Sequence, residues 1–332
     1  MNFGKYFVRR LITCILTILI GVTFVFFIPR MFPSDPVENM IGQITARSGS
    51  MDPDQMEALR SSLRMQFGLD GSLWDQYKTY ITRGLLQLDF GPSLMSYPTP
   101  VREIVGRNLP YTVGLTLFTT IIAWFFGNII GLLAGFRQNK RSSKILEAFA
   151  IFIYPIPYFI IALVMQIFFS YIFKWFPLLS TINTTGTTGQ YITSLLRASV
   201  LPAASLLLSG MGWWIISMKS LSSTTTEEDH VQFARYRGLP EVTVGNKYVF
   251  RNSILPQITA LGMSLGGAFN GSIMTEIIFG YPGIGSIVQK AILQSDYNMI
   301  MGTITISIVA VAVATFIVDL VNPLIDPRIR YS

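Results

Sequence analysis

The chain has 332 residues, of which 51% are apolar and only 13% are charged, and its mean hydropathy is +0.48. A soluble fold carries about 25% charged residues, so this composition indicates an integral membrane protein. The net charge of +7 does not indicate nucleic-acid binding. The basic residues form short clusters beside apolar runs, where membrane topology and anionic lipid account for them better.

Residue types that carry metal or hydrolytic chemistry are scarce. Cys14 is the only cysteine and His230 the only histidine, which excludes an intrachain disulfide and a histidine- or cysteine-rich metal site and disfavours a Ser-His-Asp triad. The ionisable residues near the apolar runs, Glu147, Glu276 and Asp319, lie toward the ends of those runs. An intramembrane enzyme is therefore disfavoured, and we expect no catalytic residue, cofactor or metal in the chain.

The first apolar run, Leu11 to Ile28, contains no charge and follows Lys5, Arg9 and Arg10. Its length suits one bilayer crossing, and its basic flank places the N-terminus in the cytoplasm. No small-residue cleavage site follows, so we interpret residues 1–30 as a cytoplasmic tail and a retained anchor helix.

Residues 31–107 are polar to amphipathic and are predicted to form an extracytoplasmic helical region. Asp52, with Pro53 after it, is predicted to cap one helix, and Ser72 with Asp75 is predicted to cap a second. Each helix carries an apolar stripe at helical spacing, namely Met56, Leu59, Leu63 and Phe67 in the first and Trp74, Tyr77, Ile81, Leu85 and Leu88 in the second.

Five further apolar runs are predicted to span the membrane: Pro110–Phe136, Ile145–Phe173, Ala198–Met218, Leu255–Phe279 and Met299–Leu320. Together with the first run they define an all-α integral membrane protein with six transmembrane helices. The basic clusters alternate so that both termini lie in the cytoplasm. Residues 108–322 are then a core of five transmembrane helices containing a cytoplasmic loop, 219–256, and residues 323–332 are a cytoplasmic tail.

Prolines and glycines mark special points in these spans. Pro110 is expected to start the second span, and Pro155 and Pro157 are expected to kink the third, or else to open it beside a cavity. The fifth span carries two GxxxG spacings, Gly262–Gly266 and Gly267–Gly271, which favour close helix packing.

The cytoplasmic loop contains a short helix with signals at both ends. Thr226 and Asp229 form an acidic variant of a capping box, Glu227 and Glu228 add charge that suits the helix dipole, and Gly238 followed by Pro240 ends the helix. Its predicted outward face is unusually apolar and indicates docking, with a helix that rests on the membrane surface as the alternative. That face consists of Val231, Ala234 and Tyr236 among Asp229, Arg235 and Arg237.

This loop resembles the EAA loop of type I importer permeases of the ATP-binding cassette (ABC) class, in the branch that carries dipeptides, oligopeptides and nickel. The matching residues are Asp229, Val231, Ala234, Arg235, Arg237, Gly238, Leu239, Arg251, Asn252, Ile254, Leu255 and Pro256. A second match, to the branch's E-x-x-F-x-x-P-G-x-G segment, consists of Glu276, Phe279, Pro282, Gly283 and Gly285. His230 departs from the pattern, because an aromatic residue usually follows the acid, and the literal EAA triplet is absent.

The resemblance implies a type I importer permease subunit of the cell membrane, whose helix from Glu227 to Arg237 couples it to an ATPase, with Glu228 and Gly238 among the coupling residues. The chain contains no GxxxxGK[ST] loop, so ATP is expected on partner subunits. The implied partners are a second homologous permease subunit, two ATP-binding subunits, an external solute-binding protein and membrane lipid.

The substrate and the residues that line its path are predicted as follows. Di- and oligopeptides are expected from the resemblance, with oligosaccharides or nickel as alternatives and an ion-coupled secondary carrier as the rival class. Asn270, Gln166 and Tyr158 are candidates to line a translocation cavity, and interhelical hydrogen bonds or aromatic packing are the alternative roles for them.

Overall fold

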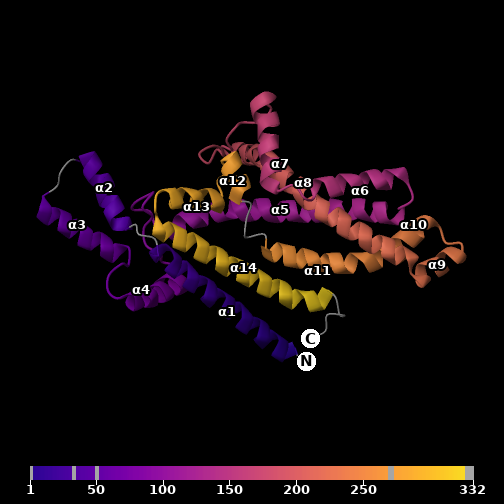
Figure 1. Cartoon of the computed structure of the whole chain (residues 1–332), viewed down its shortest axis with the longest axis horizontal. Helices are drawn as coiled ribbons and strands as arrows, with labels where there is room; N and C mark the ends of the chain where they lie inside the picture. Colours follow the sequence, from indigo (N-terminus) through magenta and orange to yellow (C-terminus); the bar gives the residue numbers. More distant parts are fainter. Residues whose placement is uncertain (1–2, 32–34, 49–51, 268–272, 326–332) are drawn as a thin grey trace. The chain divides into compact units, whose positions relative to one another are not determined.

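The computed structural model describes residues 3–31, 35–48, 52–267 and 273–325, and helices make up nearly all of this length (Figure 1). The described chain divides into two compact units. Unit 1 comprises Met1–Phe7, Val113–Tyr281 and Ala314–Ser332, and unit 2 comprises Val8–Thr112 and Pro282–Val313.

The elements in chain order include three π-helical segments, labelled η1 to η3. They are α1 (Phe3–Arg30), α2 (Pro36–Ser48), α3 (Pro53–Gln66), α4 (Leu73–Thr79), η1 (Tyr80–Leu85), α5 (Val101–Phe136), α6 (Arg141–Ile153), α7 (Tyr158–Met165), η2 (Gln166–Ile172), α8 (Thr188–Glu227), α9 (Asp229–Tyr236), α10 (Glu241–Thr243), η3 (Val244–Phe250), α11 (Arg251–Gly267), α12 (Ile273–Phe279), α13 (Ile284–Leu293) and α14 (Tyr297–Ile325).

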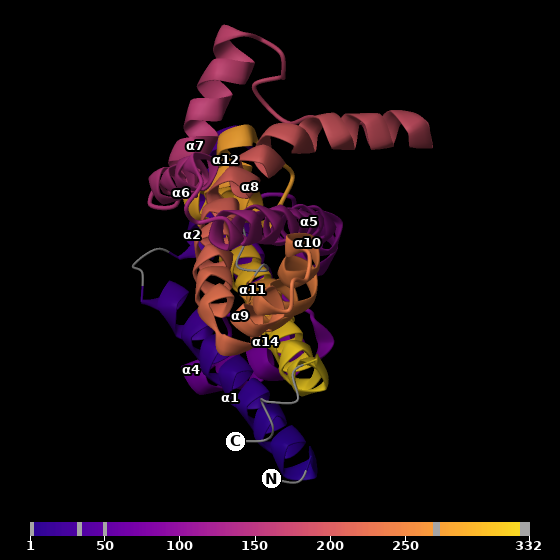
Figure 2. The ribbon, with the colours of Figure 1, turned by 90° about the vertical axis from the view of Figure 1, so that its right-hand side faces the viewer.

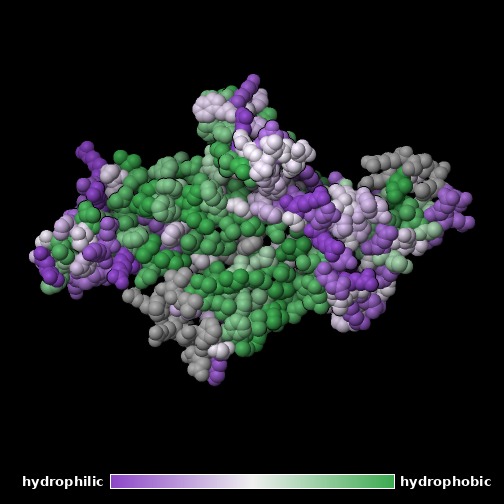
Figure 3. Space-filling model, turned by 180° about the vertical axis from the view of Figure 1, so that it is seen from behind, coloured by the Kyte–Doolittle hydropathy of each residue, from purple (hydrophilic) through white to green (hydrophobic). Residues whose placement is uncertain are grey.

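Four helices of the described chain, α1, α5, α8 and α14, are long and apolar enough to cross a membrane, and the bent pair of α6 with α7–η2 makes a possible fifth span. This outcome confirms the all-α membrane fold. The six-span count stays a prediction, because the run Leu255–Phe279 is divided into α11 and α12, and residues 268–272 between them lie outside the described chain. On the face drawn in Figure 3, hydrophobic residues form wide areas of the kind that lipid covers.

The second span begins earlier than its proline predicts. α5 starts at Val101, and Pro110 lies inside it. The Val101 amide donates a hydrogen bond to the Gly91 carbonyl oxygen at 3.0 Å, and Val101 and Val105 are buried in the core of unit 2. This apolar packing stabilises the added turns, and a membrane helix can accommodate an internal proline.

The prolines of the third span break the helix more sharply than a kink. α6 ends at Ile153 and α7 begins at Tyr158, with an angle of 97° between the two helices. Pro155 and Pro157 cannot donate backbone hydrogen bonds, and Pro157 disfavours helical geometry in Ile156 before it, whereas Tyr154 keeps helical angles before Pro155. Two prolines so close together therefore end one helix, and Pro157 then stands at the cap of the next.

In unit 1, α5 and α8 pack so closely that side chains are excluded at three glycines of α5. These are Gly127, Gly131 and Gly135, one helical turn apart, and they face Trp214, Met218 and Ser222 of α8. A Cβ atom at Gly131 would lie 2.6 Å from the Ile215 carbonyl oxygen. The close contact of small residues thus lies in the second span. The packing role predicted for the GxxxG spacings of the fifth span stays a prediction.

Unit 2 has two apolar clusters. The larger one joins α1, η1, α5, α13 and α14, and includes Phe26, Tyr80 and Met299. Tyr77, Ile81 and Leu85 of the predicted stripe pack against it, whereas Trp74 and Leu88 are exposed. Leu88 leaves the stripe because its backbone is left-handed, with φ of 53°.

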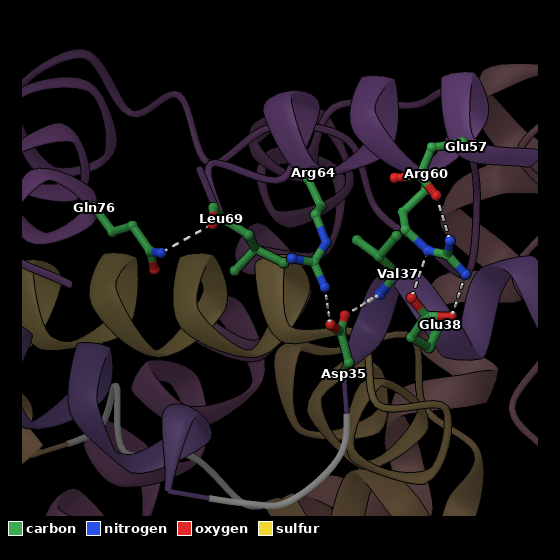
Figure 4. A network of polar contacts seen from close by, with 8 residues as sticks. All are labelled: Asp35, Val37, Glu38, Glu57, Arg60, Arg64, Leu69 and Gln76. Atoms are coloured by element: carbon green, nitrogen blue, oxygen red, sulfur yellow. Dashed lines mark hydrogen bonds and ion pairs between the residues drawn. The ribbon is translucent and has the colours of Figure 1, made fainter. Parts of the chain in front are cut away.

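The smaller cluster holds α2 against α3 through Val37, Ile41, Leu63 and Phe67. Ion pairs surround it on the surface (Figure 4): Arg60 contacts Glu38 at 2.8 Å and Glu57 at 2.6 Å, and Arg64 contacts Asp35 at 2.9 Å. We refer to α2 and α3 with these contacts as the α2–α3 hairpin.

Both predicted caps of this region are confirmed. The Asp52 carboxylate accepts a hydrogen bond from the Asp54 amide at 3.0 Å, and the Ser72 hydroxyl accepts one from the Asp75 amide at 3.3 Å. The Ser72 hydroxyl also donates to the Asp75 carboxylate, and with Lys78 it holds the pKa of Asp75 below its usual value.

Candidate coupling site

The short helix of the loop begins later than predicted. α8 continues to Glu227, so Thr226 lies inside it and donates its hydroxyl to the Ser222 carbonyl oxygen at 2.6 Å. Glu228 is extended and stands at the cap position of α9, which runs from Asp229 to Tyr236. The predicted Thr226 cap is therefore wrong. A hydroxyl can bond back to its own helix, and here that bond suits the continuation of α8.

The predicted end of α9 is confirmed. Gly238 has a left-handed backbone with φ of 70°, and its amide donates to the Arg235 carbonyl oxygen at 2.8 Å. Glycine adopts this conformation without a Cβ penalty. Pro240 then stands at the cap position of α10, so the chain turns directly into the next helical segment.

The predicted outward face of α9 is wrong in two of its apolar members. Val231 is 0% exposed and Ala234 2% exposed, and both pack with Val244 and Val249 of η3. Leu132 and Phe136 of α5, with Leu239 and Tyr248, pack around these four residues, which we call the α9 cluster. The elements lie together beside the C-terminal end of α8 (Figures 1 and 2).

Large apolar side chains nevertheless cover the outer side of α9. Tyr236 is 86% exposed, as predicted, and Phe233, which the sequence interpretation did not include, is 64% exposed. Val242 of α10 adds a third exposed apolar side chain, at 72%. A short helix that is anchored from below and presents aromatic rings has the composition of a protein interface.

The two arginines of α9 have different environments. Arg235 forms an ion pair with Glu241 at 3.4 Å, and its guanidinium lies over the Phe136 ring, 5.6 Å from the ring centre. Arg237 is exposed, and no ion pair joins it to any residue in the described chain. Arg235 therefore fixes α9 to α10 and α5, and Arg237 is available to another molecule.

His230 connects α9 to the start of α11. Its Nδ1 lies 3.2 Å from a carboxylate oxygen of Glu228, and its Nε2 lies 3.1 Å from the side-chain nitrogen of Asn252. The same Asn252 nitrogen donates to the Tyr248 carbonyl oxygen at 2.8 Å. Asn252 donates in both of its contacts, so Nε2 of His230 is the acceptor in this pair and Nδ1 is the nitrogen that faces Glu228.

The end of the loop joins the long helices. Arg251 and Asn252 begin α11, which continues through Leu255 and Pro256. The Ser253 hydroxyl donates to the Thr225 hydroxyl at 3.2 Å, and the Gln257 amide donates to the Ser217 hydroxyl at 2.7 Å, so two bonds tie α11 to α8.

The second matching segment forms the predicted turn and short helix. Glu276 is buried in α12, and its carbonyl oxygen accepts a hydrogen bond from the Tyr281 amide at 2.8 Å. Pro282 lies in the turn, Gly283 stands at the cap position of α13, and Gly285 is buried in the first turn of that helix.

The candidates for cavity lining stay predictions. Gln166 donates hydrogen bonds to the carbonyl oxygens of Leu178 at 2.9 Å and Ile278 at 2.7 Å, which is the interhelical role considered as the alternative. Tyr158 makes an edge contact with Phe159. Asn270 lies outside the described residues.

Comparison with known proteins identifies the class. Residues 127–331 match the family described as the binding-protein-dependent transport system inner membrane component. The chain belongs to this family and is a type I ABC importer permease of the peptide and nickel branch. As a member, it is an integral membrane component of a transport system that also contains ATP-binding and substrate-binding partners.

Relatives align over almost the whole chain. The chain is 31% identical over 331 residues to the oligopeptide transport system permease protein AppB of Bacillus subtilis, an alignment that covers 99% of this chain and 100% of the relative. It is 28% identical over 326 residues to the dipeptide transport system permease protein DppB of Lactococcus lactis, covering 98% and 99%. It is also 28% identical over 328 residues to the glutathione transport system permease protein GsiC of Salmonella typhi, covering 99% of each chain.

Proposed function

We propose that this chain is the permease subunit of an ATP-driven importer of di- and oligopeptides, and that α9 is the element through which ATP hydrolysis acts on it. The observation that supports this coupling role is that α9 has one buried side and one exposed side with aromatic residues. Val231 and Ala234 are buried in the α9 cluster, while Phe233 and Tyr236 are offered outward. Peptide is the proposed substrate because the aligned relatives are named for dipeptide, oligopeptide and glutathione transport.

The mechanism follows from how α9 is mounted. Phe136 at the end of α5 packs against the α9 cluster, and Ser253 and Gln257 tie the segment that follows to α8. A partner that binds Phe233 and Tyr236 is therefore connected through α9 to α5 and α8, and movement of α9 must move these two long helices as well. ATP-driven movement of the partner would then reorient the spans and switch the transport path between outward and inward access.

The topology and assembly belong to the same proposal. Six spans place the loop 219–256 and both termini in the cytoplasm and residues 31–107 outside, with residues 108–322 as the permease core. The complete importer contains a second, homologous permease subunit, two ATP-binding subunits that hold the nucleotide, and an external solute-binding protein. This chain supplies neither an ATPase site nor a bound cofactor.

The test uses the complete complex in proteoliposomes with ATP inside. Replacing Phe233 and Tyr236 together by serine is expected to reduce both recovery of the ATP-binding subunits with the permease and ATP-dependent peptide uptake by at least about thirtyfold, because the loss of aromatic anchors at an interface costs about 2 kcal/mol or more in total. Both side chains are exposed in the isolated subunit, so its own folding is spared.

Met65→Ser in α3 is the matched control, because Met65 is equally exposed, at 73%, but lies outside the loop. If the double variant retains its ATP-binding subunits and full uptake, α9 is not the coupling element. Uptake that persists without ATP and follows an ion gradient would instead establish a secondary carrier, and uptake of oligosaccharide or nickel alone would replace peptide as the substrate.

A further inference from the structure

Unit 1 contains a cavity at the end of α8 opposite to α9. The chain from the end of η2 to the start of α8, together with the first turns of α8, borders an open cavity of about 750 Å³. Its lining residues are Lys174, Phe176, Pro177, Thr181, Asn183, Gly189, Gln190, Thr193, Ser194, Arg197 and Ala198. This volume lies within the range of pockets that bind small molecules, about 300–1,000 Å³.

The charge of this cavity is positive and lacks a local counter-charge. Lys174 and Arg197 are among its lining residues, and none of the lining residues is acidic. The sequence from residue 148 to residue 226 contains no aspartate or glutamate. The acid of the adjoining helix α12, Glu276, is buried and does not line the cavity. No ion pair joins Lys174 or Arg197 to another residue of the described chain.

The walls of the cavity are fixed by hydrogen bonds. The Asn183 amide donates to the Ser194 hydroxyl at 3.0 Å, and the Ser180 hydroxyl donates to the Ala198 carbonyl oxygen at 3.0 Å, so the loop is tied to α8 at two points. Thr187 and Gln190 form a reciprocal capping box at the start of α8. The cavity is therefore preformed, and a ligand loses little free energy in ordering it.

Lys174 is held in a conformation that lysine rarely adopts. Its backbone is left-handed, with φ of 54°. The next residue fixes this turn, because the Trp175 amide donates to the Phe169 carbonyl oxygen at 2.9 Å and the Trp175 ring stacks on Phe173. Strained residues that are fixed by their surroundings concentrate at binding sites.

We propose that this cavity binds the carboxylate group of a peptide, with Arg197 and Lys174 as its charged partners. This inference rests on the proposed function and names a subsite for the same substrate. Every peptide with a free C-terminus carries a carboxylate, so the subsite accepts different sequences. The Thr181 hydroxyl can bind a peptide backbone group, the Thr193 hydroxyl oxygen, whose proton goes to Gly189, can accept from a peptide N–H, and the side-chain nitrogen of Gln190, whose oxygen is held in the capping box, can donate to a peptide carbonyl oxygen. Phe176 and Pro177 can pack against side chains.

The test is direct binding to the complete complex in phosphatidylcholine nanodiscs, without the external binding protein. The probes are trialanine and trialanine amide, followed by saturation-transfer NMR. Trialanine is expected to bind at least about tenfold more tightly than its amide, because a hydrogen bond to a charged group contributes about 1.5–3 kcal/mol. Arg197→Gln and Lys174→Gln should each weaken trialanine binding about tenfold and remove most of the difference between the probes.

Arg197→Lys should retain most of the binding, and Lys144→Gln, which removes an exposed cation of α6 outside the cavity, should leave it unchanged. Equal binding of the two probes overturns the proposal, as does unchanged binding in both glutamine variants. A third result would also overturn it. If phosphatidylglycerol nanodiscs displace trialanine completely, and a glutamine variant changes only the amount of lipid that the complex retains, the cavity holds a lipid headgroup and not a peptide.

These outcomes are separable from those of the proposed function. A wild-type complex that imports peptides yet binds trialanine and its amide equally contradicts only the carboxylate subsite. A complex that prefers trialanine to its amide but imports no peptide with any external binding protein contradicts the proposed transport function and leaves the binding site standing.

Discussion

The α2–α3 hairpin and the loop around α9 are both short helical segments with an apolar cluster beneath them, but they differ in what they offer outward. In the hairpin, Arg60 and Arg64 are neutralised by carboxylates of the same hairpin. In the loop, Arg237 and two aromatic side chains are exposed. The hairpin thus pairs its arginines within itself, whereas a segment that exposes aromatic rings has the surface of a subunit contact.

The largest expected effect is at the end of α9. Gly238→Val places a β-branched residue at φ of 70°, a conformation that costs about 1–3 kcal/mol for residues with a side chain. We expect α9 to be reoriented and ATP-dependent uptake to be abolished while the subunit still inserts into the membrane. Gly238→Asn should retain much of the uptake, since asparagine tolerates this conformation. Full uptake by the valine variant would show that the direction of α9 does not matter.

The next effect is expected beneath the loop, where α5 supports the α9 cluster. Gly131→Ala brings a Cβ atom to 2.6 Å from the Ile215 carbonyl oxygen, so α5 and α8 must separate. Overpacking of this kind costs about 1–3 kcal/mol, measured as a lower thermal unfolding temperature in detergent. Gly114→Ala is the control, because nothing lies within 4 Å of a Cβ atom there. Equal melting of the two variants would contradict the close packing.

A comparable but smaller loss is expected within the α9 cluster. Val231→Ala removes two buried methyl groups, and we expect a destabilisation of about 1–2 kcal/mol together with weaker retention of the ATP-binding subunits. Val242→Ala, at an exposed position of α10, should leave thermal stability unchanged. If Val242→Ala destabilises the subunit as much as Val231→Ala, the distinction between buried and exposed side chains in this loop is wrong.

His230→Phe tests the link between α9 and α11. The change restores the aromatic residue usual in the family and removes the contacts with Glu228 and Asn252, so we expect a loss of about 0.5–1.5 kcal/mol in stability. Peptide transported per ATP hydrolysed is the functional measurement. A double-mutant cycle with Asn252→Ala should show a coupling energy between the two positions, and additive effects would exclude the link.

The smallest effect is expected in the hairpin. Arg60→Gln removes two surface ion pairs, and exposed pairs of this kind contribute little to stability, so the thermal unfolding temperature should hardly change and uptake should stay at the wild-type level. A strong loss of uptake in this variant would mean that the hairpin, like the loop, has a charged partner outside the chain.

The sequence predicted those features that depend on local chemistry. Asp52, Ser72 and Gly238 each act at the predicted helix end, because capping and left-handed backbone depend on neighbouring residues alone. The prediction of a Thr226 cap was wrong because the same hydroxyl can either cap a new helix or bond back to the helix that contains it. Only the continuation of α8 decides between these two roles.

Tertiary contacts account for what the sequence did not predict. Val231 and Ala234 lie three residues apart on one side of α9, a spacing typical of a buried stripe, but their burial depends on η3 and α5. The spacing of Gly127, Gly131 and Gly135 was a signal for close packing that the sequence interpretation overlooked. Nothing local to Lys174 and Arg197 indicates a shared cavity, since 22 positions separate them in the sequence and a fold is needed to join them.

The length of α8 has a mechanical consequence for any motion that begins at α9. Its 40 residues form one helix of about 60 Å, with the cavity beside its first turns and α9 just beyond its last. A tilt of about 5° at the α9 end displaces the opposite end by about 5 Å, close to one helical turn. Pro202 inside this helix removes one backbone hydrogen bond, and so sets where such a lever would bend.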